Sequence, residues 1–414
     1  MSDVIFNAGL NRNLRLIPWY ALAFRAFFWN PVFFLFFNSH FTVPEVLRLE
    51  AIYYAGVVLL EAPSGYFSDV IGRRITLIIA ALGACAGHAL FFFGEGFYCF
   101  AAAQLCLAAG ISFNSGTITA IHYDSLDALG RESEFGPREA VVERNGFLAE
   151  AISALLGGLA AVIQLRYAYG LSFVAAAAAL VLVLAMMEPA THKKQAAVGR
   201  GFAHQLRLCA GYARKPGLLW LFAFVVLMTV LNHVPFEFYQ PYTQQVLGEQ
   251  ILAGTRTPAA TGLIAFVTLM AATFVAARSM RIRDRFGLPA ALLGATALQV
   301  LIIGVMGLLF HPIVLVLVLL RSCPRALMAA PLNAAIAPEI PQQQRATYLS
   351  LQSLAGRFAF SGVLVALSLL AEYTGKDGPG ALLLMLRASF VLGAVGFLGL
   401  GLTARRLKRL EKAE

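Results

Sequence analysis

Residues 61–74 of the chain read Glu61-Ala-Pro-Ser-Gly65-Tyr-Phe-Ser-Asp69-Val-Ile-Gly72-Arg73-Arg74. This stretch connects two long apolar runs. Gly65 has no side chain and permits another helix to approach closely, and Asp69 ends the first run at a polar boundary. Gly72 allows a tight turn, and the two arginines after it offer charges that carboxylates can pair with. The stretch therefore predicts a helical hairpin whose polar connection can be locked against other helices.

Apolar runs of similar length recur along the whole chain. Hydrophobic residues make up 59% of the 414 residues and charged residues only 13%, whereas about a quarter of the residues in soluble domains are charged. A bilayer is crossed by a helix of about 20 apolar residues. We therefore expect an all-α integral membrane protein with twelve transmembrane helices. These helices are expected at residues 16–38, 45–68, 75–94, 97–122, 141–165, 167–188, 217–240, 259–280, 288–310, 312–336, 346–371 and 380–403.

A polar stretch divides the twelve runs into two sets of six. The expected parts are an N-terminal six-helix bundle (1–190), a cytoplasmic linker (191–216), a C-terminal six-helix bundle (217–404) and a basic cytoplasmic tail (405–414). With both termini cytoplasmic, most Lys and Arg residues face the inside, as the positive-inside rule requires. The net charge of +10 thus reflects topology and contact with anionic lipid, not nucleic acid. We expect a multi-pass protein of the inner (cytoplasmic) membrane.

The two halves share a short pattern. Asp69-Val-Ile-Gly72 recurs as Asp284-Arg-Phe-Gly287 at the equivalent helix connection of the second half. Internal repeats mark transporter folds whose binding site lies between the repeats. The second copy lacks the first glycine and the arginine pair, which weakens its expected locking role.

The connection at residues 61–74 is similar to the G-x-x-x-D-x-x-G-R-R/K signature of the major facilitator superfamily, and here it is complete. Segments 115–126 and 345–347 also look like bacterial members of that superfamily. The resemblance implies two pseudo-symmetric six-helix bundles, a cavity lined by helices 1, 4, 7 and 10, and a monomer. It implies that this loop engages helix 11 and stabilises the outward-facing conformation. The gating residues implied in this way are Gly65, Asp69, Gly72, Arg73, Arg74, Asp284 and Gly287.

Several arginines lie in the middle of expected helices. Charged side chains at mid-bilayer cost roughly 2.5–3.5 kcal/mol, so they usually face a cavity. We expect Arg25 and Arg321, with Arg357, to bind an anionic group of a substrate, because a guanidinium makes paired hydrogen bonds to carboxylate. Arg325 lies one turn beyond Arg321. The alternative is that each arginine is neutralised by a neighbouring acid, with Glu61 as the partner of Arg25.

Other polar residues at spanning depth are further candidates. Glu61 and Glu150 are the candidates for proton coupling, because a buried carboxyl can titrate near neutral pH. For Glu150, pairing with an arginine is an equally good interpretation. Asn114 and Asn232 are candidate substrate-binding residues, although polar contacts between helices explain them equally well.

These features favour a secondary active transporter of a small, partly apolar, anionic or zwitterionic organic solute. It would work by alternating access with protons as coupling ion, and the resemblance favours export. The alternatives are uptake of an organic acid or siderophore, multidrug efflux of cations, and a transport-dead membrane sensor on the same fold. No clustered catalytic residues indicate an enzyme. The five cysteines are scattered, and no motif predicts a metal, nucleotide or other cofactor.

Overall fold

The computed structural model describes residues 2–189, 201–247, 257–375 and 378–409. All regular secondary structure in these residues is helical, and they include no β-strand. Ten of their helices are long and apolar enough to cross a membrane. The first two expected spans complete the set of twelve. The first of them is interrupted, and the second is a charged helix of 28 residues. The all-α membrane fold expected from the sequence is confirmed.

The N-terminal half contains the helices that form the first six spans. They are α1 (Ser2–Phe24), η1 (Asn30–Val32), α2 (Phe33–Asn38), α3 (Val43–Val70), α4 (Arg73–Phe93), α5 (Phe97–Asn114), α6 (Thr117–Asp127), η2 (Glu132–Glu134), α7 (Phe135–Ile163) and α8 (Arg166–Leu184). The C-terminal half repeats this plan. Its helices are α10 (Pro216–Leu247), α11 (Thr257–Ala276), α12 (Ser279–Phe286), α13 (Leu288–Leu308), α14 (Pro312–Val318), α15 (Cys323–Ile336), η5 (Ala337–Glu339), α16 (Gln342–Tyr373), α17 (Gly378–Thr403) and η6 (Ala404–Arg409).

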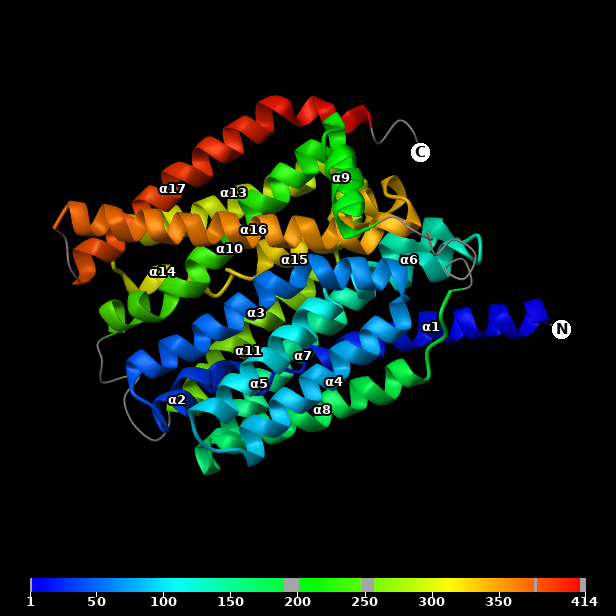
Figure 1. The fold of residues 1–414 in the computed structure, drawn as a ribbon. Coiled ribbons are helices and arrows are strands. Elements are labelled where there is room, and N and C mark those ends of the chain that lie inside the picture. Colours follow the sequence, from blue (N-terminus) through cyan, green and yellow to red (C-terminus); the bar gives the residue numbers. More distant parts are fainter. Residues whose placement is uncertain (1, 190–200, 248–256, 376–377, 410–414) are drawn as a thin grey trace.

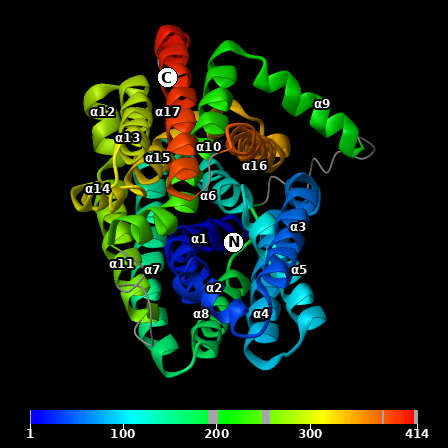
Figure 2. The same ribbon diagram turned by 90° about the vertical axis from the view of Figure 1, so that its left-hand side faces the viewer.

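The two halves form two bundles that pack side by side. Seen along the helices, α1 to α8 occupy the lower part of Figure 2, and α10, α13 and α15 to α17 occupy the upper part. The most extensive contacts between the bundles are those of α3 with α16 and of α7 with α11. In the second pair Gly158 faces Gly262, where an added Cβ would lie 3.0 Å from the Cα of the opposite glycine. Small residues thus allow the two bundles to approach closely.

Three of the expected continuous helices are interrupted, which corrects the predictions at residues 16–38, 97–122 and 312–336. The first breaks between α1 and α2, the second between α5 and α6, and the third between α14 and α15. Gly116 has φ +68° at the second break, a conformation that favours glycine. Pro324 lies in the first turn of α15, where its missing N–H costs no helical hydrogen bond. The breaks place backbone ends inside the bundles.

The repeated connections also match in backbone conformation. Gly72 begins α4 with φ +136°, and Gly287 begins α13 with φ +85°. Both connections therefore use a glycine where a side chain would be strained. This match supports the internal pseudo-symmetry expected from the sequence.

The linker expected at residues 191–216 contains a helix that the polar composition did not predict. Residues 191–200 of that linker lie outside the described residues, and α9 (Phe202–Ala213) follows them. In Figure 1, α9 crosses α16 at the end of the molecule where α1 begins. Of the tail expected at residues 405–414, the last five residues are not described.

Candidate functional site

Asp69 makes the central contact between the two halves. Its carboxylate accepts hydrogen bonds from the backbone N–H groups of Ala346 (3.2 Å) and Thr347 (2.8 Å), the fifth and sixth residues of α16. It also pairs with Arg73. Hydrogen bonds to an ionised carboxylate are stronger than those between neutral groups. The loop from α3 to α4 therefore holds α16 of the opposite bundle.

Arg73 extends this contact. It is fully buried, and its Nη2 donates to the carbonyl oxygen of Gln342 (2.6 Å) while its Nε donates to Asp124 (3.1 Å). Asp124 in turn pairs with Arg345 on α16. We call Asp69, Arg73, Asp124, Arg345 and Thr347 the interbundle network. Two of the elements that carry it, α6 and the start of α16, lie toward the same end of the molecule as the start of α1 in Figure 1.

Arg74 makes its contacts within the N-terminal half. The Arg74 side chain donates from Nη2 to the carbonyl oxygen of Leu184 (2.7 Å). The carboxylate of Glu188 accepts from the backbone N–H groups of Arg73 (2.8 Å) and Arg74 (2.7 Å), which caps α4. In the second copy, Asp284 is exposed on α12.

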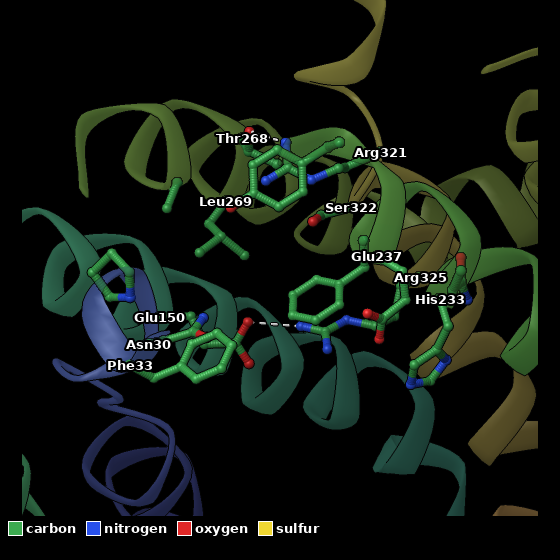
Figure 3. Close-up of a pocket in the computed structure, with 15 residues that line it drawn as sticks. Asn30, Phe33, Glu150, His233, Glu237, Thr268, Leu269, Arg321, Ser322 and Arg325 are labelled. Carbon is green, nitrogen blue, oxygen red and sulfur yellow. Dashed lines mark hydrogen bonds and ion pairs between the residues drawn. The ribbon is translucent and has the colours of Figure 1, made fainter. Parts of the chain in front are cut away.

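A cavity of about 300 Å³ lies between the bundles. The N-terminal half contributes Asn30, Phe33 and Glu150, and the C-terminal half contributes most of the other lining residues. Figure 3 shows Arg321, Ser322 and Thr268 on one side of the cavity and Glu150, Asn30 and Phe33 on another. The lining from the second half consists of Asn232, His233, Phe236, Glu237, Tyr239, Ala265, Thr268, Leu269, Arg321, Ser322 and Arg325.

Arg321 lies in this cavity at the break between α14 and α15. Its Nη1 donates to the hydroxyl of Thr268 (3.0 Å) and to the carbonyl oxygen of Val318 (3.2 Å). The guanidinium carbon lies 4.2 Å from the ring centre of Tyr239. No ion pair of Arg321 with an acid occurs in the described part of the chain. A guanidinium has five N–H donors, so Arg321 retains donors for a ligand.

Arg25 is held by two acids and does not line the cavity. Its Nη1 lies 2.9 Å from Glu143, and its Nη2 lies 2.8 Å from Glu150. Glu150 also pairs with Arg325 of the opposite half at 2.7 Å, as the dashed line in Figure 3 shows. Arg25 thus has acidic partners, but Glu61, the partner considered from the sequence, is not one of them.

Glu61 pairs with Arg357 instead, at the interface between α3 and α16. The Arg357 Nε lies 3.9 Å from a carboxylate oxygen of Glu61 and 3.4 Å from the hydroxyl of Ser353. Glu61 is fully buried, and neither of its oxygens has a hydrogen-bond partner among the described residues. Both residues therefore lie apart from the cavity lining.

The two asparagines have different surroundings. Asn114 ends α5 and accepts a hydrogen bond from the hydroxyl of Tyr20 (3.0 Å), so it connects helices. Asn232 lines the cavity, and its buried Oδ1 has no partner within the described ranges. Thr268 and Tyr239 were not predicted as site residues. The Pro324 that follows Arg321 and Ser322 is the one sequence signal that could have indicated a break there.

Comparisons with known proteins agree with this architecture. A family model described as Major Facilitator Superfamily matches residues 19–364. A solved structure of the nucleoside transporter NupG is similar with a TM-score of 0.65 at 12% identity, covering 96% of this chain and 99% of that chain. The E. coli fucose:proton symporter FucP gives 0.66 at 15% identity, covering 93% and 97%. A FucP structure in the outward conformation gives 0.68 at 13%, covering 94% and 98%. No curated protein sequence matches the chain. At these identities the structural likeness shows the fold alone.

Proposed function

The chain belongs to the major facilitator superfamily, and we propose that it exports a small, partly apolar organic solute with an anionic group, using protons as coupling ion. Its membership makes it a multi-pass secondary transporter that binds a small molecule, and not an enzyme. In this proposal the protein acts as a monomer in the inner (cytoplasmic) membrane, with both termini and the linker in the cytoplasm.

The surroundings of Arg321 are the observation that supports a substrate with an anionic group. A charged side chain between transmembrane helices is costly without a partner, and Arg321 has no acidic partner in the described chain. It lies in the cavity that both bundles line. A substrate carboxylate would supply the missing charge and accept two parallel hydrogen bonds. Arg25 and Arg325 suit this role less well, because Glu150 holds both of them.

Proton coupling is proposed for Glu61 and Glu150. A proton on Glu61 would remove a charge from the α3–α16 interface, where its contact with Arg357 is long at 3.9 Å. A proton on Glu150 would weaken its pairing with Arg325 of the opposite bundle. Either event changes the energy of contact between the bundles, which alternating access requires.

The interbundle network supports an orientation for the proposed cycle. With the termini inside, Asp69 and its partners would close the cytoplasmic side of the cavity. Export then begins when these contacts break and the cavity opens to the cytoplasm. Uptake of an organic acid is the second candidate, because one structural neighbour, FucP, is a proton symporter.

Reconstitution tests this function. Proteoliposomes with an imposed pH gradient and an internal pH dye are given anionic, zwitterionic and cationic organic solutes in turn. We expect proton movement with anionic solutes that Arg321→Gln abolishes and that Arg207→Gln, at an exposed position of α9, preserves. Signals with lipophilic cations alone would replace this proposal by multidrug efflux. If the protein binds the solutes but no solute produces proton movement, a transport-dead sensor is favoured.

A further inference from the structure

We propose that the cavity is bipolar and takes an elongated zwitterion, with its anionic end at Arg321, an aromatic or aliphatic body, and its cationic end at Glu50. This inference rests on the proposed anionic site at Arg321 and adds a second recognition site. Its basis is a second cavity whose one charged lining residue, among the residues described, is a carboxylate.

The second cavity adjoins the first. It has a volume of about 180 Å³, and three residues line both cavities: Asn30, Phe33 and Phe236. The shared residues come from both halves of the chain. A solute longer than either cavity could therefore extend from one to the other along the rings of Phe33 and Phe236.

A carboxylate lines the second cavity. Glu50, on α3, is half-buried and accepts one hydrogen bond from the side-chain amide of Gln104 (3.0 Å). Glu237, on α10 of the other half, lines the first cavity beside the shared residue Phe236. Within the described ranges no Lys or Arg pairs with Glu50 or Glu237. A cationic group in the second cavity would pair with the Glu50 carboxylate.

Aromatic side chains make up most of the remaining lining. They are Trp29, Phe33, Phe37, Tyr53, Tyr54, Phe91, Tyr169 and Phe236. Tyr169 is 1% exposed, and its hydroxyl has no hydrogen-bond partner in the described structure. The faces of aromatic rings attract cations, and a tyrosine oxygen accepts hydrogen bonds from ammonium. A buried hydroxyl without a partner, beside Glu50 in a cavity, indicates that a ligand donates to this site.

The end of the site that would bind the anionic group has the opposite charge at Arg321. Arg321 and Ser322 line the first cavity, and α15 begins directly after them. The free N–H groups and dipole of a helix N-terminus favour negative charge. Opposite charges at the two ends would select against a solute bearing a single charge, because its neutral end would leave one charged end of the site unpaired.

Binding of three matched probes tests the inference. The probes are 4-phenylbutyrate, 4-propylbenzylamine and 4-(4-aminomethylphenyl)butyrate, which carry the anion, the cation and both. Trp29 lines the second cavity, so its fluorescence reports binding to purified protein in which Trp19 and Trp220 are replaced by Phe. We expect the zwitterion to bind about tenfold more tightly than either single-charge probe, since a charge-assisted contact contributes on that scale.

Variants test which residue binds each end of the zwitterion. Glu50→Gln should reduce the affinity for the zwitterion to that for phenylbutyrate and leave phenylbutyrate unchanged, whereas Glu50→Asp should retain part of the advantage. Arg321→Gln should remove the contribution of the carboxylate and leave that of the amine. Glu95→Gln, whose side chain is 82% exposed, is the matched control, and thermal unfolding confirms that each variant is folded.

The outcomes separate this inference from the proposed function. If phenylbutyrate binds through Arg321 but the amine adds nothing, the bipolar site is overturned and the anionic transporter stands. If binding does not depend on Arg321, the proposed function fails as well. If Glu50→Gln leaves all affinities unchanged but abolishes proton movement, Glu50 carries protons and is not a substrate contact, which also overturns the inference.

Discussion

Asp69 of the first half accepts a hydrogen bond from the backbone N–H of Thr347 in the second half, 278 residues later in the chain, at 2.8 Å. Asp69 binds the backbone of α16 near its N-terminal end, so the contact holds the helix and not only a side chain. Because Asp69 also pairs with Arg73, which binds the carbonyl oxygen of Gln342, these two charged residues of the loop both contact the start of α16. Opening this side requires that all these contacts break together.

Asp69→Asn should therefore weaken the closed state. The amide keeps one acceptor oxygen but loses the charge that pairs with Arg73 and with the helix end, and hydrogen bonds to charged groups contribute about 1.5–3 kcal/mol each. We expect transport to fall at least about tenfold while the protein remains folded, as measured by solute flux and thermal unfolding. Asp284→Asn, in the exposed second copy, is the control and should retain flux. Equal loss in both variants would contradict a specific role for Asp69.

Cys209 offers a reporter for the same movement. It is 1% exposed on α9, and burial raises the pKa of its thiol to about 12. Since the thiolate is the reactive form, maleimide should label Cys209 very slowly at pH 7 and faster as the pH rises. The Sγ contacts the carbonyl oxygen of Gln344 at 3.8 Å, so separation of α9 from α16 would expose it.

Labelling is measured by mass shift in a variant that retains only Cys209 among the five cysteines. We expect Asp69→Asn to raise the labelling rate about tenfold or more, in line with a shift of about 1.4 kcal/mol in the equilibrium. If Cys209 is labelled as fast as an exposed thiol while Asp69 is unchanged, α9 does not cover Cys209.

Sequence reasoning could predict the hairpin at residues 61–74 because its signals are local: a glycine, an acid and a turn within a few residues. The position of Arg321 within the apolar run at residues 312–336 also predicts that it lies at mid-membrane. Sequence reasoning could not assign ion-pair partners. Arg25 pairs with Glu143 and Glu150, more than a hundred residues away, because helix rotation and packing decide which side chains meet. The helix break that places Arg321 depends in the same way on tertiary contacts.

Glu61 and Glu150 should respond differently to neutralisation. Glu61 has no hydrogen bond in the described structure and one long ion pair, so Glu61→Gln should remain folded. Glu150 holds Arg25 and Arg325 at 2.8 and 2.7 Å. Glu150→Gln should therefore lower stability by roughly 3 kcal/mol, the scale for removing one partner of a buried pair.

Unfolding midpoints and two flux assays distinguish the roles. If Glu61 couples protons, Glu61→Gln loses flux driven by a pH gradient but retains exchange of solute for solute. Glu143→Gln, which leaves the Glu150 contacts in place, is the control for Arg25. Full pH-driven flux in Glu61→Gln would remove Glu61 from the coupling mechanism.

Gly65 permits a close approach of α3 to α16. A Cβ added there would lie 2.8 Å from the Oγ of Ser350 and 2.9 Å from the carbonyl oxygen of Ala346, which is shorter than normal van der Waals contact. Gly65→Ala should therefore push α16 away, reduce flux and increase labelling of Cys209. Gly294→Ala, where an added Cβ meets nothing within 4 Å, should do neither. Ser350→Ala removes the nearest of the three clashing atoms and leaves the Cβ of residue 350 at 2.9 Å, so it should partly restore flux to Gly65→Ala. If the double variant is as impaired as the single one, the remaining clashes with the Cβ of residue 350 and the carbonyl oxygen of Ala346 are enough to separate the helices.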